Sequence, residues 1–258
     1  MNKISAIAGV VLKELYRRKD AYVLFVLTVV ITLVMGSVRF FNDPKIVVYL
    51  KQICLLLIWI SALVIAITTA ARQIPAEREQ RTLLPLLAKP LTRPQLILGK
   101  FFGCWFACGL ALICFYFFFG ALAASREHQW PLLNYFQAAV LQWFMLGVVV
   151  ALALLGSLVF AAPSSNATII FVVVAGILLV GRHLDQVALS LPEPSQSIVS
   201  AVYFAIPHLE LFDLRDLIVH DWPLIPWNFF GLAILYALAY TAIFLLAACL
   251  VFQRKTVN

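Results

Sequence analysis

The sequence predicts an all-α membrane protein, because it is very apolar, sparsely charged and divided into long runs without charge. Of its 258 residues, 64% are hydrophobic and only 12% are charged. Its mean hydropathy is +0.99. Soluble domains have about 45–50% apolar and about 25% charged residues, so a soluble fold of this length would leave much apolar surface in water. We therefore expect the chain to lie in lipid.

Six runs contain no Asp, Glu, Lys or Arg, and each is near or above the roughly 18–20 residues that a helix needs to cross the hydrocarbon core. They are Ala21–Val38, Gln52–Ala71, Phe101–Ala124, Leu132–Ala162, Pro163–Gly181 and Trp227–Phe252. Proline and three polar residues in Ala162–Asn166 indicate a tight hairpin between the fourth and fifth runs. We predict one membrane domain over residues 1–258, with spans one and two in 21–71, spans three to five in 96–181 and span six in 227–252.

The positions of the basic residues predict the orientation of these spans. Thirteen of the 19 Lys and Arg residues fall in the N-terminal segment, in the segment 72–100 and at the C-terminus. Cytoplasmic loops carry an excess of Lys and Arg, so we place both termini and residues 72–100 in the cytoplasm and the protein in the cell (inner) membrane. The net charge of +7 then reflects topology and does not indicate a nucleic-acid partner.

Residues 1–19 predict an amphipathic helix on the cytoplasmic surface of the membrane. Apolar residues recur there at helical spacing, and charged residues occupy the rest of the helix circumference. The apolar positions are Ile4, Ile7, Ala8, Val11, Leu12 and Leu15. The alternative is a simple cytoplasmic extension of span one.

The sequence argues against several classes of function. Proton-coupled transporters and intramembrane proteases place ionisable residues inside their spans, and these six runs have no Asp, Glu, Lys, Arg or His. The chain also has no G-x-x-x-x-G-K-[ST] loop to bind ATP. We therefore predict that it is not an enzyme and binds no cofactor itself. Energy for transport would come from another subunit.

The segment 72–95 predicts a short charged helix at the membrane surface. Pro75 suits the first turn of a helix, and Glu77 and Glu79 follow near the positive end of the helix dipole. Thr92 and Gln95 match a capping box that opens the third span. The alternative is a solvated loop whose charges serve only the topology.

The pattern E-R-E-x-R-T-L-x-x-L-L-A-K-P-L-T-R-x-x-x-x-x-G-K, from Glu77 to Lys100, resembles the ABC-2 type permeases, the membrane subunits of type V ABC transporters. Within them it looks most like the subgroup associated with multicopper-enzyme maturation. A second block, before the last span, is similar to the same family. This outer-segment motif consists of Pro207, His208, Glu210 and Asp213 with intervening apolar residues.

The resemblance implies that residues 72–95 form a coupling loop that docks on a cytoplasmic ABC ATPase. ATP and magnesium would then be bound by that partner subunit. The family also implies a homodimer with the translocation path between the two copies. By matching position, the residues assigned to ATPase coupling are Glu77, Arg78, Glu79, Arg81, Lys89, Arg93, Gly99 and Lys100.

Residues 182–226 predict two short helices at the outer surface. An apolar stretch covers Ile198–Ile206 and an amphipathic one covers Leu209–His220. Histidines and acids in this segment raise the possibility of a metal site, but their spacing matches no known ligand motif, so we predict none. In the resembling family this region caps the path.

Polar groups within the spans are few, so we expect a largely apolar path and the export of a hydrophobic or amphipathic cargo. The candidate polar groups are Ser61, Thr68, Thr69, Asn134, Gln137, Gln142, Ser157 and Asn166. Small residues recur every four positions at Gly99, Gly103, Ala107 and Ala111, a face that fits either a dimer contact or packing within one subunit. The main alternative function is a non-transporting membrane anchor or assembly factor. A membrane enzyme and a secondary transporter are disfavoured by the lack of ionisable residues in the spans.

Overall fold

The computed structural model describes residues 3–17, 26, 29–30, 44–79, 92–127, 132–190 and 195–254. In these ranges the regular elements are helices throughout. They are α1 (Lys3–Arg17), α3 (Pro44–Ala71), α4 (Pro75–Glu79), α6 (Arg93–Glu127), α7 (Leu132–Val159), α8 (Pro163–Ser190), α9 (Ser195–Ala205), the 3-10 helix η1 (Leu209–Phe212), α10 (Arg215–Val219) and α11 (Trp227–Arg254).

Four helical segments of the described chain are long and apolar enough to cross a membrane, so the protein is a multi-pass membrane protein. These segments correspond to predicted spans two, three, four and six. They are Lys51–Glu79, Arg93–Ala121, Leu132–Val159 and Trp227–Arg254. Predicted span five corresponds to the shorter apolar helix Pro163–Leu179. Predicted span one, Ala21–Val38, lies almost entirely outside the described residues, and the total of six spans stays a prediction.

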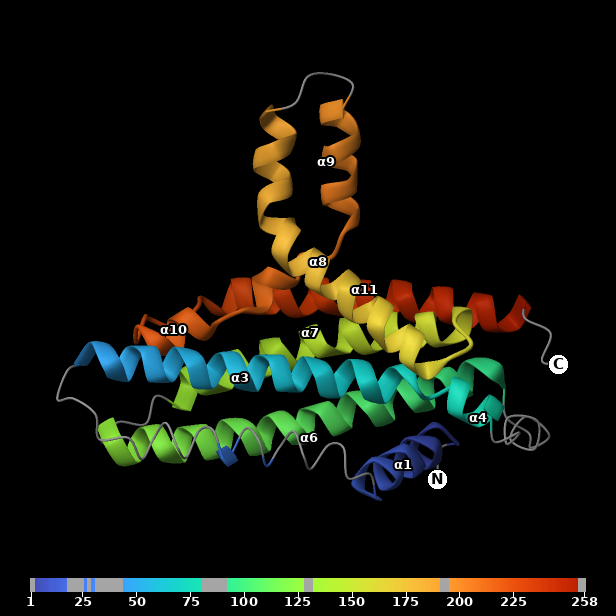
Figure 1. The fold of residues 1–258 in the computed structure, drawn as a ribbon, viewed down its shortest axis with the longest axis horizontal. Helices are drawn as coiled ribbons and strands as arrows, with labels where there is room; N and C mark the ends of the chain where they lie inside the picture. The colour runs from blue at the N-terminus through green and yellow to red at the C-terminus, as the bar shows by residue number, and fades with distance from the viewer. Residues whose placement is uncertain are drawn as a thin grey trace.

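The long helices lie side by side along the longest axis of the molecule (Figure 1). Helix α7 is the central one, because it contacts α3, α6, α8 and α11. Its most apolar stretch is 67% buried, whereas that of α11 is only 22% buried and faces outward. Helices α1 and α4 and the C-terminus lie at one end of the bundle, and α10 lies at the other (Figure 1). We call these the α4 end and the α10 end.

Two tryptophans join α6 to the central helix α7. The indole nitrogen of Trp105 donates to the backbone oxygen of Trp143, and that of Trp143 donates to the backbone oxygen of Trp105, each at 2.9 Å. Their rings stack with centroids 4.5 Å apart. A Cβ at Gly109 would lie 2.7 Å from the Trp143 nitrogen, and one at Gly147 would lie 3.0 Å from the Trp105 nitrogen. Glycine at both positions therefore makes room for the facing indole.

Small residues on α6 also receive α1. A Cβ at Gly99 would lie 2.7 Å from Ile7, and one at Gly103 would lie 2.6 Å from Val11. The apolar side of the predicted N-terminal helix thus packs on this part of α6. For Gly99 and Gly103, the small-residue face is used within one subunit.

The predicted hairpin between spans four and five is confirmed. Helix α7 ends at Val159 and α8 begins at Pro163. The fully buried Asn166 donates from its amide nitrogen to the backbone oxygens of Ala71 at 3.2 Å and Ala153 at 3.1 Å. One turn-forming residue therefore joins the start of α8 to both α3 and α7.

Helix α8 continues beyond the predicted end of span five at Gly181. It ends at Ser190, so the first part of the predicted outer segment belongs to this helix. The two short helices expected in 182–226 are observed as α9 and, across the amphipathic stretch, as η1 and α10. Helix α9 and the second part of α8 form a hairpin that projects from the side of the bundle (Figure 1).

Candidate functional site

The predicted charged helix at the α4 end begins at Pro75, as expected, and continues directly from α3. A turn over Arg72–Ile74 separates the two helices. Backbone bonds from Ala76 to Arg72, 3.0 Å, and from Arg78 to Ile74, 3.1 Å, connect α4 to this turn. Helix α4 therefore follows α3 with one tight turn between them. Of the predicted coupling residues, Arg81 and Lys89 lie outside the described residues.

Lys100 of α6 provides a buried positive charge beneath α4. Lys100 is only 3% exposed. Its ammonium nitrogen lies 2.7 Å from a carboxylate oxygen of Glu77, and it donates to the backbone oxygen of Gln73 at 2.6 Å and to the side-chain oxygen of Gln73 at 3.3 Å. These three acceptors match the three donors of an ammonium group. A buried charge needs such partners to be tolerated, so α4 is held to α6 by an ion pair.

This geometry gives Glu77 a partner within the chain, and its assignment to ATPase coupling stays a prediction. The sequence suggested that Glu77 faces a partner together with its neighbours, but its carboxylate turns toward Lys100. The reason is the buried charge on α6, which no residue adjacent to it in sequence neutralises. Glu79 is exposed and Arg78 is partly exposed, so these two remain accessible on α4.

The start of α6 is also tied to the end of α11. The predicted capping box is confirmed: the Thr92 N–H donates to the Gln95 side chain at 3.2 Å, and the Gln95 N–H donates to the Thr92 hydroxyl at 3.4 Å. The Arg93 guanidinium donates to the backbone oxygens of Phe252 at 2.8 Å and Gln253 at 2.9 Å. A cation near the C-terminus of a helix binds carbonyls that lack partners within that helix.

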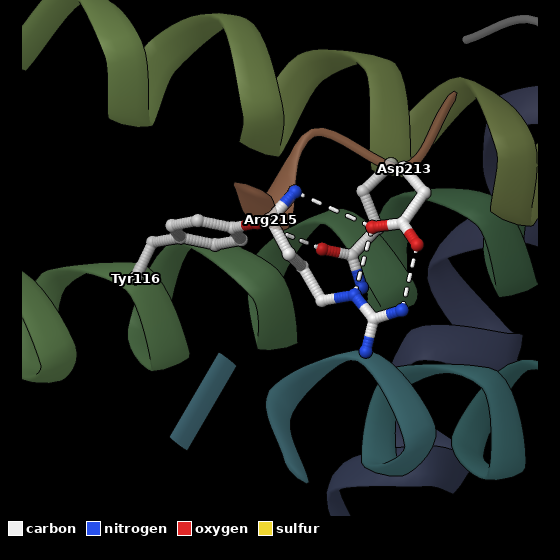
Figure 2. A network of polar contacts seen from close by, with 4 residues as sticks. Tyr116, Asp213 and Arg215 are labelled. Carbon is white, nitrogen blue, oxygen red and sulfur yellow. Dashed lines mark hydrogen bonds and ion pairs between the residues drawn. The ribbon is translucent and has the colours of Figure 1, made fainter. Parts of the chain in front are cut away.

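A second group of polar residues lies inside the bundle. The Arg215 guanidinium donates to both carboxylate oxygens of Asp213, at 2.7 and 2.6 Å (Figure 2). It also lies 5.3 Å from the ring centre of Trp59. The Tyr116 hydroxyl donates to the side-chain oxygen of Gln142 at 3.0 Å. We call Trp59, Tyr116, Gln142, Asp213 and Arg215 the buried polar cluster.

The buried polar cluster lies near the middle of α3 along the length of that helix. Trp59 lies 15 residues from the start of α3 and 12 residues from its end. At 1.5 Å per residue it is about 22 Å from one end of that helix and about 18 Å from the other. Helix α10 contacts both α3 and α7, and the Arg215 side chain reaches Trp59 from there.

This position adds to the inference from the sequence. Although the predicted spans contain no Asp, Glu, Lys or Arg, the segment before the last span carries Asp213 and Arg215 into the bundle. Pairing with Asp213 raises the pKa of Arg215, so the arginine stays charged. The sequence argument against ion-coupled transport therefore holds for the span sequences alone.

The outer-segment motif attaches the re-entering segment to its surroundings. Pro207 is buried, the His208 N–H donates to the Tyr236 hydroxyl at 2.9 Å, and the His208 ring lies 4.4 Å from that of Tyr203. The Glu210 carboxylate lies against Gly181 of α8. Among the residues described, no three of His, Cys, Asp and Glu gather as metal ligands.

Most of the polar groups expected along the path instead bond within the fold. Gln137 exchanges two hydrogen bonds with the backbone of Ile225, at 3.0 and 3.1 Å. Asn134 donates to the backbone oxygen of Trp222 at 3.2 Å. Thr69 and Ser157 bond to carbonyls of their own helices. Gln137 and Asn134 therefore fix the connection before α11, whereas the hydroxyls of Thr69 and Ser157 form their hydrogen bonds within their own helices.

Sequence reasoning missed Trp59, Tyr116 and Arg215 as members of a site. The available signal was Asp213-x-Arg215, a close pair of opposite charges directly after apolar motif residues. Leu209 and Phe212 of that motif are each 1% exposed and anchor the segment in the core. A charged pair attached to such an anchor is expected to be buried with it.

The fold and these sites define a helical, multi-pass membrane protein with a charged helix attached to its spans. The family model for ABC-2 family transporter proteins matches residues 53–257, and the chain belongs to that family. No curated protein matched the chain. The family is in general a transport component without enzymatic activity and typically pairs with an ATP-binding subunit.

Proposed function

We propose that the chain is the permease subunit of an ATP-driven exporter whose ATPase is a separate cytoplasmic protein. The observation that carries this proposal is the ion pair between Glu77 and the buried Lys100, which joins α4 to a membrane-length helix. A solvated loop that served topology alone would not require a buried counter-charge. The pair gives α4 a direct mechanical connection to the membrane helices.

In this proposal the ATPase binds the accessible side of α4 at Arg78 and Glu79. Charged contacts suit an interface that must assemble and shift, because its groups remain solvated when it opens. Motion of α4 passes to α6 through Lys100 and to α3 through the turn at 72–74. The Asn166 amide, bonded to Ala71 at the end of α3, carries the same motion to α8.

The α4 end is then cytoplasmic, and the membrane is the cell (inner) membrane. Both termini lie at this end, which agrees with the distribution of basic residues (Figure 1). We further propose a homodimer with the path between the copies, in keeping with the frequency of two-fold symmetry. ATP and magnesium belong to the partner, and a hydrophobic or amphipathic cargo suits the apolar helices.

The test begins with a tagged full chain purified gently from native membranes. We expect a stoichiometric nucleotide-binding subunit in the purified sample. Reversal of the accessible charge, Glu79→Lys, should remove it, whereas reversal of an exposed acid at the α10 end, Asp216→Lys, should not. If no nucleotide-binding protein co-purifies under conditions that preserve another ABC complex, the anchor or assembly function replaces this proposal.

A second variant separates docking from coupling. Lys100→Met should retain the bound ATPase, because α4 keeps its accessible residues. It should weaken the stimulation of ATP hydrolysis by the permease, because α6 loses its connection to α4. Full stimulation in Lys100→Met would show that the ion pair does not transmit the motion.

A further inference from the structure

The buried polar cluster has two N–H donors without acceptors. The indole nitrogen of Trp59 and the side-chain nitrogen of Gln142 are buried and have no hydrogen-bond partner. Gln142 is 2% exposed, and its oxygen already accepts from Tyr116. Buried donors in proteins are nearly always satisfied, so two of them in one cluster require an explanation.

The two donors come from different helices and are linked through other members of the cluster. Trp59 of α3 lies against the Arg215 guanidinium, and the Tyr116 hydroxyl donates to Gln142 of α7. Tyr116 lies beside Arg215 and Asp213 (Figure 2). Side chains of Arg215 and Asp213 keep 24% and 15% exposure, so the cluster can be reached from outside the core.

The chemistry of the cluster selects the kind of group that fits it. The unpaired atoms are donors, so the ligand must present an acceptor. The Asp213 carboxylate already neutralises Arg215 and would repel a second anion, which disfavours a phosphate or a carboxylate. An uncharged carbonyl oxygen meets both conditions. Trp59, Tyr116 and Gln142 belong to the apolar helices α3, α6 and α7, which contact one another, so the rest of such a ligand would be a hydrocarbon chain.

We propose that Trp59 and Gln142 form a binding site for the carbonyl oxygen of an acyl ester, beside the neutralised Asp213–Arg215 pair. The site recognises the polar end of an amphipathic molecule through two N–H donors, while the neighbouring helices contact its chain. Its existence does not depend on the ATPase. Only the identification of the ester as transported cargo rests on the function proposed above.

The experiment uses the full chain in dodecyl maltoside, a detergent without an ester. The probe is a fatty-acid methyl ester with a photoreactive diazirine on its acyl chain, and the matched probe is the diazirine alkane without the ester. We expect saturable labelling of peptides around the cluster by the ester probe. Trp59→Phe keeps the ring beside Arg215 but removes the N–H, and one lost hydrogen bond should weaken binding about fivefold.

Two further variants keep the test decisive. Gln142→Leu removes the second donor and should weaken labelling as well. It therefore tests the proposed site even if Trp59→Phe does not fold. Trp143→Phe removes an indole N–H that is already bonded to Trp105, and it should leave labelling unchanged. Equal labelling by the two probes, or full labelling of folded Trp59→Phe and Gln142→Leu, would overturn the site and leave water as the partner of these donors.

A final measurement separates the two sources of an ester. With the ATPase bound, stimulation of ATP hydrolysis by the ester in the wild type but not in Trp59→Phe identifies transported cargo. Saturable binding without stimulation identifies a membrane lipid that stays in the site. Both outcomes support the site, and only the first supports its role in transport.

Discussion

The α4 end and the buried polar cluster each contain charged side chains inside the protein. They differ in whether the N–H donors of the region have hydrogen-bond acceptors. At the α4 end, Lys100 has three acceptors, and Arg93 bonds to two carbonyls of α11. In the buried polar cluster the Asp213–Arg215 pair is equally well bonded, yet two nearby N–H donors have no acceptor. The comparison separates a buried cation, Lys100, whose N–H donors have acceptors within the chain, from a cluster that contains two N–H donors without one.

The largest expected effect comes from breaking the connection at Glu77. Glu77→Ala leaves the ammonium of Lys100, which is 3% exposed, without its counter-charge, and should reduce the free energy of unfolding by about 3 kcal/mol. The measurement is an unfolding titration in mixed detergent micelles. Lys100→Met should cost less, because the carboxylate it leaves behind keeps 21% exposure and can be hydrated.

The double variant provides the control for this prediction. Replacing both charges, Glu77→Ala with Lys100→Met, should be more stable than Glu77→Ala alone, since an apolar pair needs no desolvated charge. Additive losses in the two single variants would mean that the pair does not interact, and the proposed connection between α4 and α6 would fail.

The sequence predicted the helices well because lipid imposes a simple rule on composition. Long runs without charge marked the segments now seen as α3, α6, α7 and α11, and the turn residues before Asn166 marked the α7–α8 hairpin. The extent of α8 was missed, because Arg182 ended the charge-free run but did not end the helix. A charge limits the hydrophobic part of a helix and says little about where the helix stops.

The sites were less predictable, because they depend on contacts between distant segments. The capping box at Thr92 and Gln95 was readable, since both residues lie within one turn. The partner of Lys100 and the burial of Arg215 were not, because each depends on how a loop returns to the bundle. Charge patterns in sequence reveal which residues are available, while tertiary packing decides which of them face each other.

Helix packing at the tryptophan pair offers a second test, with a smaller expected effect. Gly109→Ala would place its Cβ 2.7 Å from the Trp143 indole nitrogen, between two helices that bond reciprocally. Such overpacking should cost about 2 kcal/mol in the same unfolding titration. Gly176→Ala in α8 meets nothing within 4 Å and should cost nothing or stabilise slightly. Equal effects at the two glycines would contradict this packing.

The contact between α6 and α11 should contribute less to the free energy of unfolding than the Glu77–Lys100 ion pair or the packing at Gly109. Arg93→Gln removes two charge-assisted bonds to the backbone of α11, but the site is partly exposed and water can replace them, so the expected loss is about 1 kcal/mol. Arg254→Gln, at an exposed position near the same helix end, should change stability by less than about 0.5 kcal/mol. A larger effect at Arg254 would show that general charge, and not this contact, stabilises the α4 end.

The smallest expected change in stability is that on removing the Trp59 N–H, and it tests the site proposed at the buried polar cluster. Trp59→Phe deletes a buried donor that has no acceptor, so in detergent without ester it should leave stability unchanged or raise it slightly. Trp143→Phe deletes a donor that is bonded to Trp105 and should cost about 1 kcal/mol, because the carbonyl it leaves is partly buried. The two substitutions are chemically identical, so their difference measures whether the N–H is used. A loss in Trp59→Phe as large as that in Trp143→Phe would mean that the Trp59 donor is satisfied without a ligand.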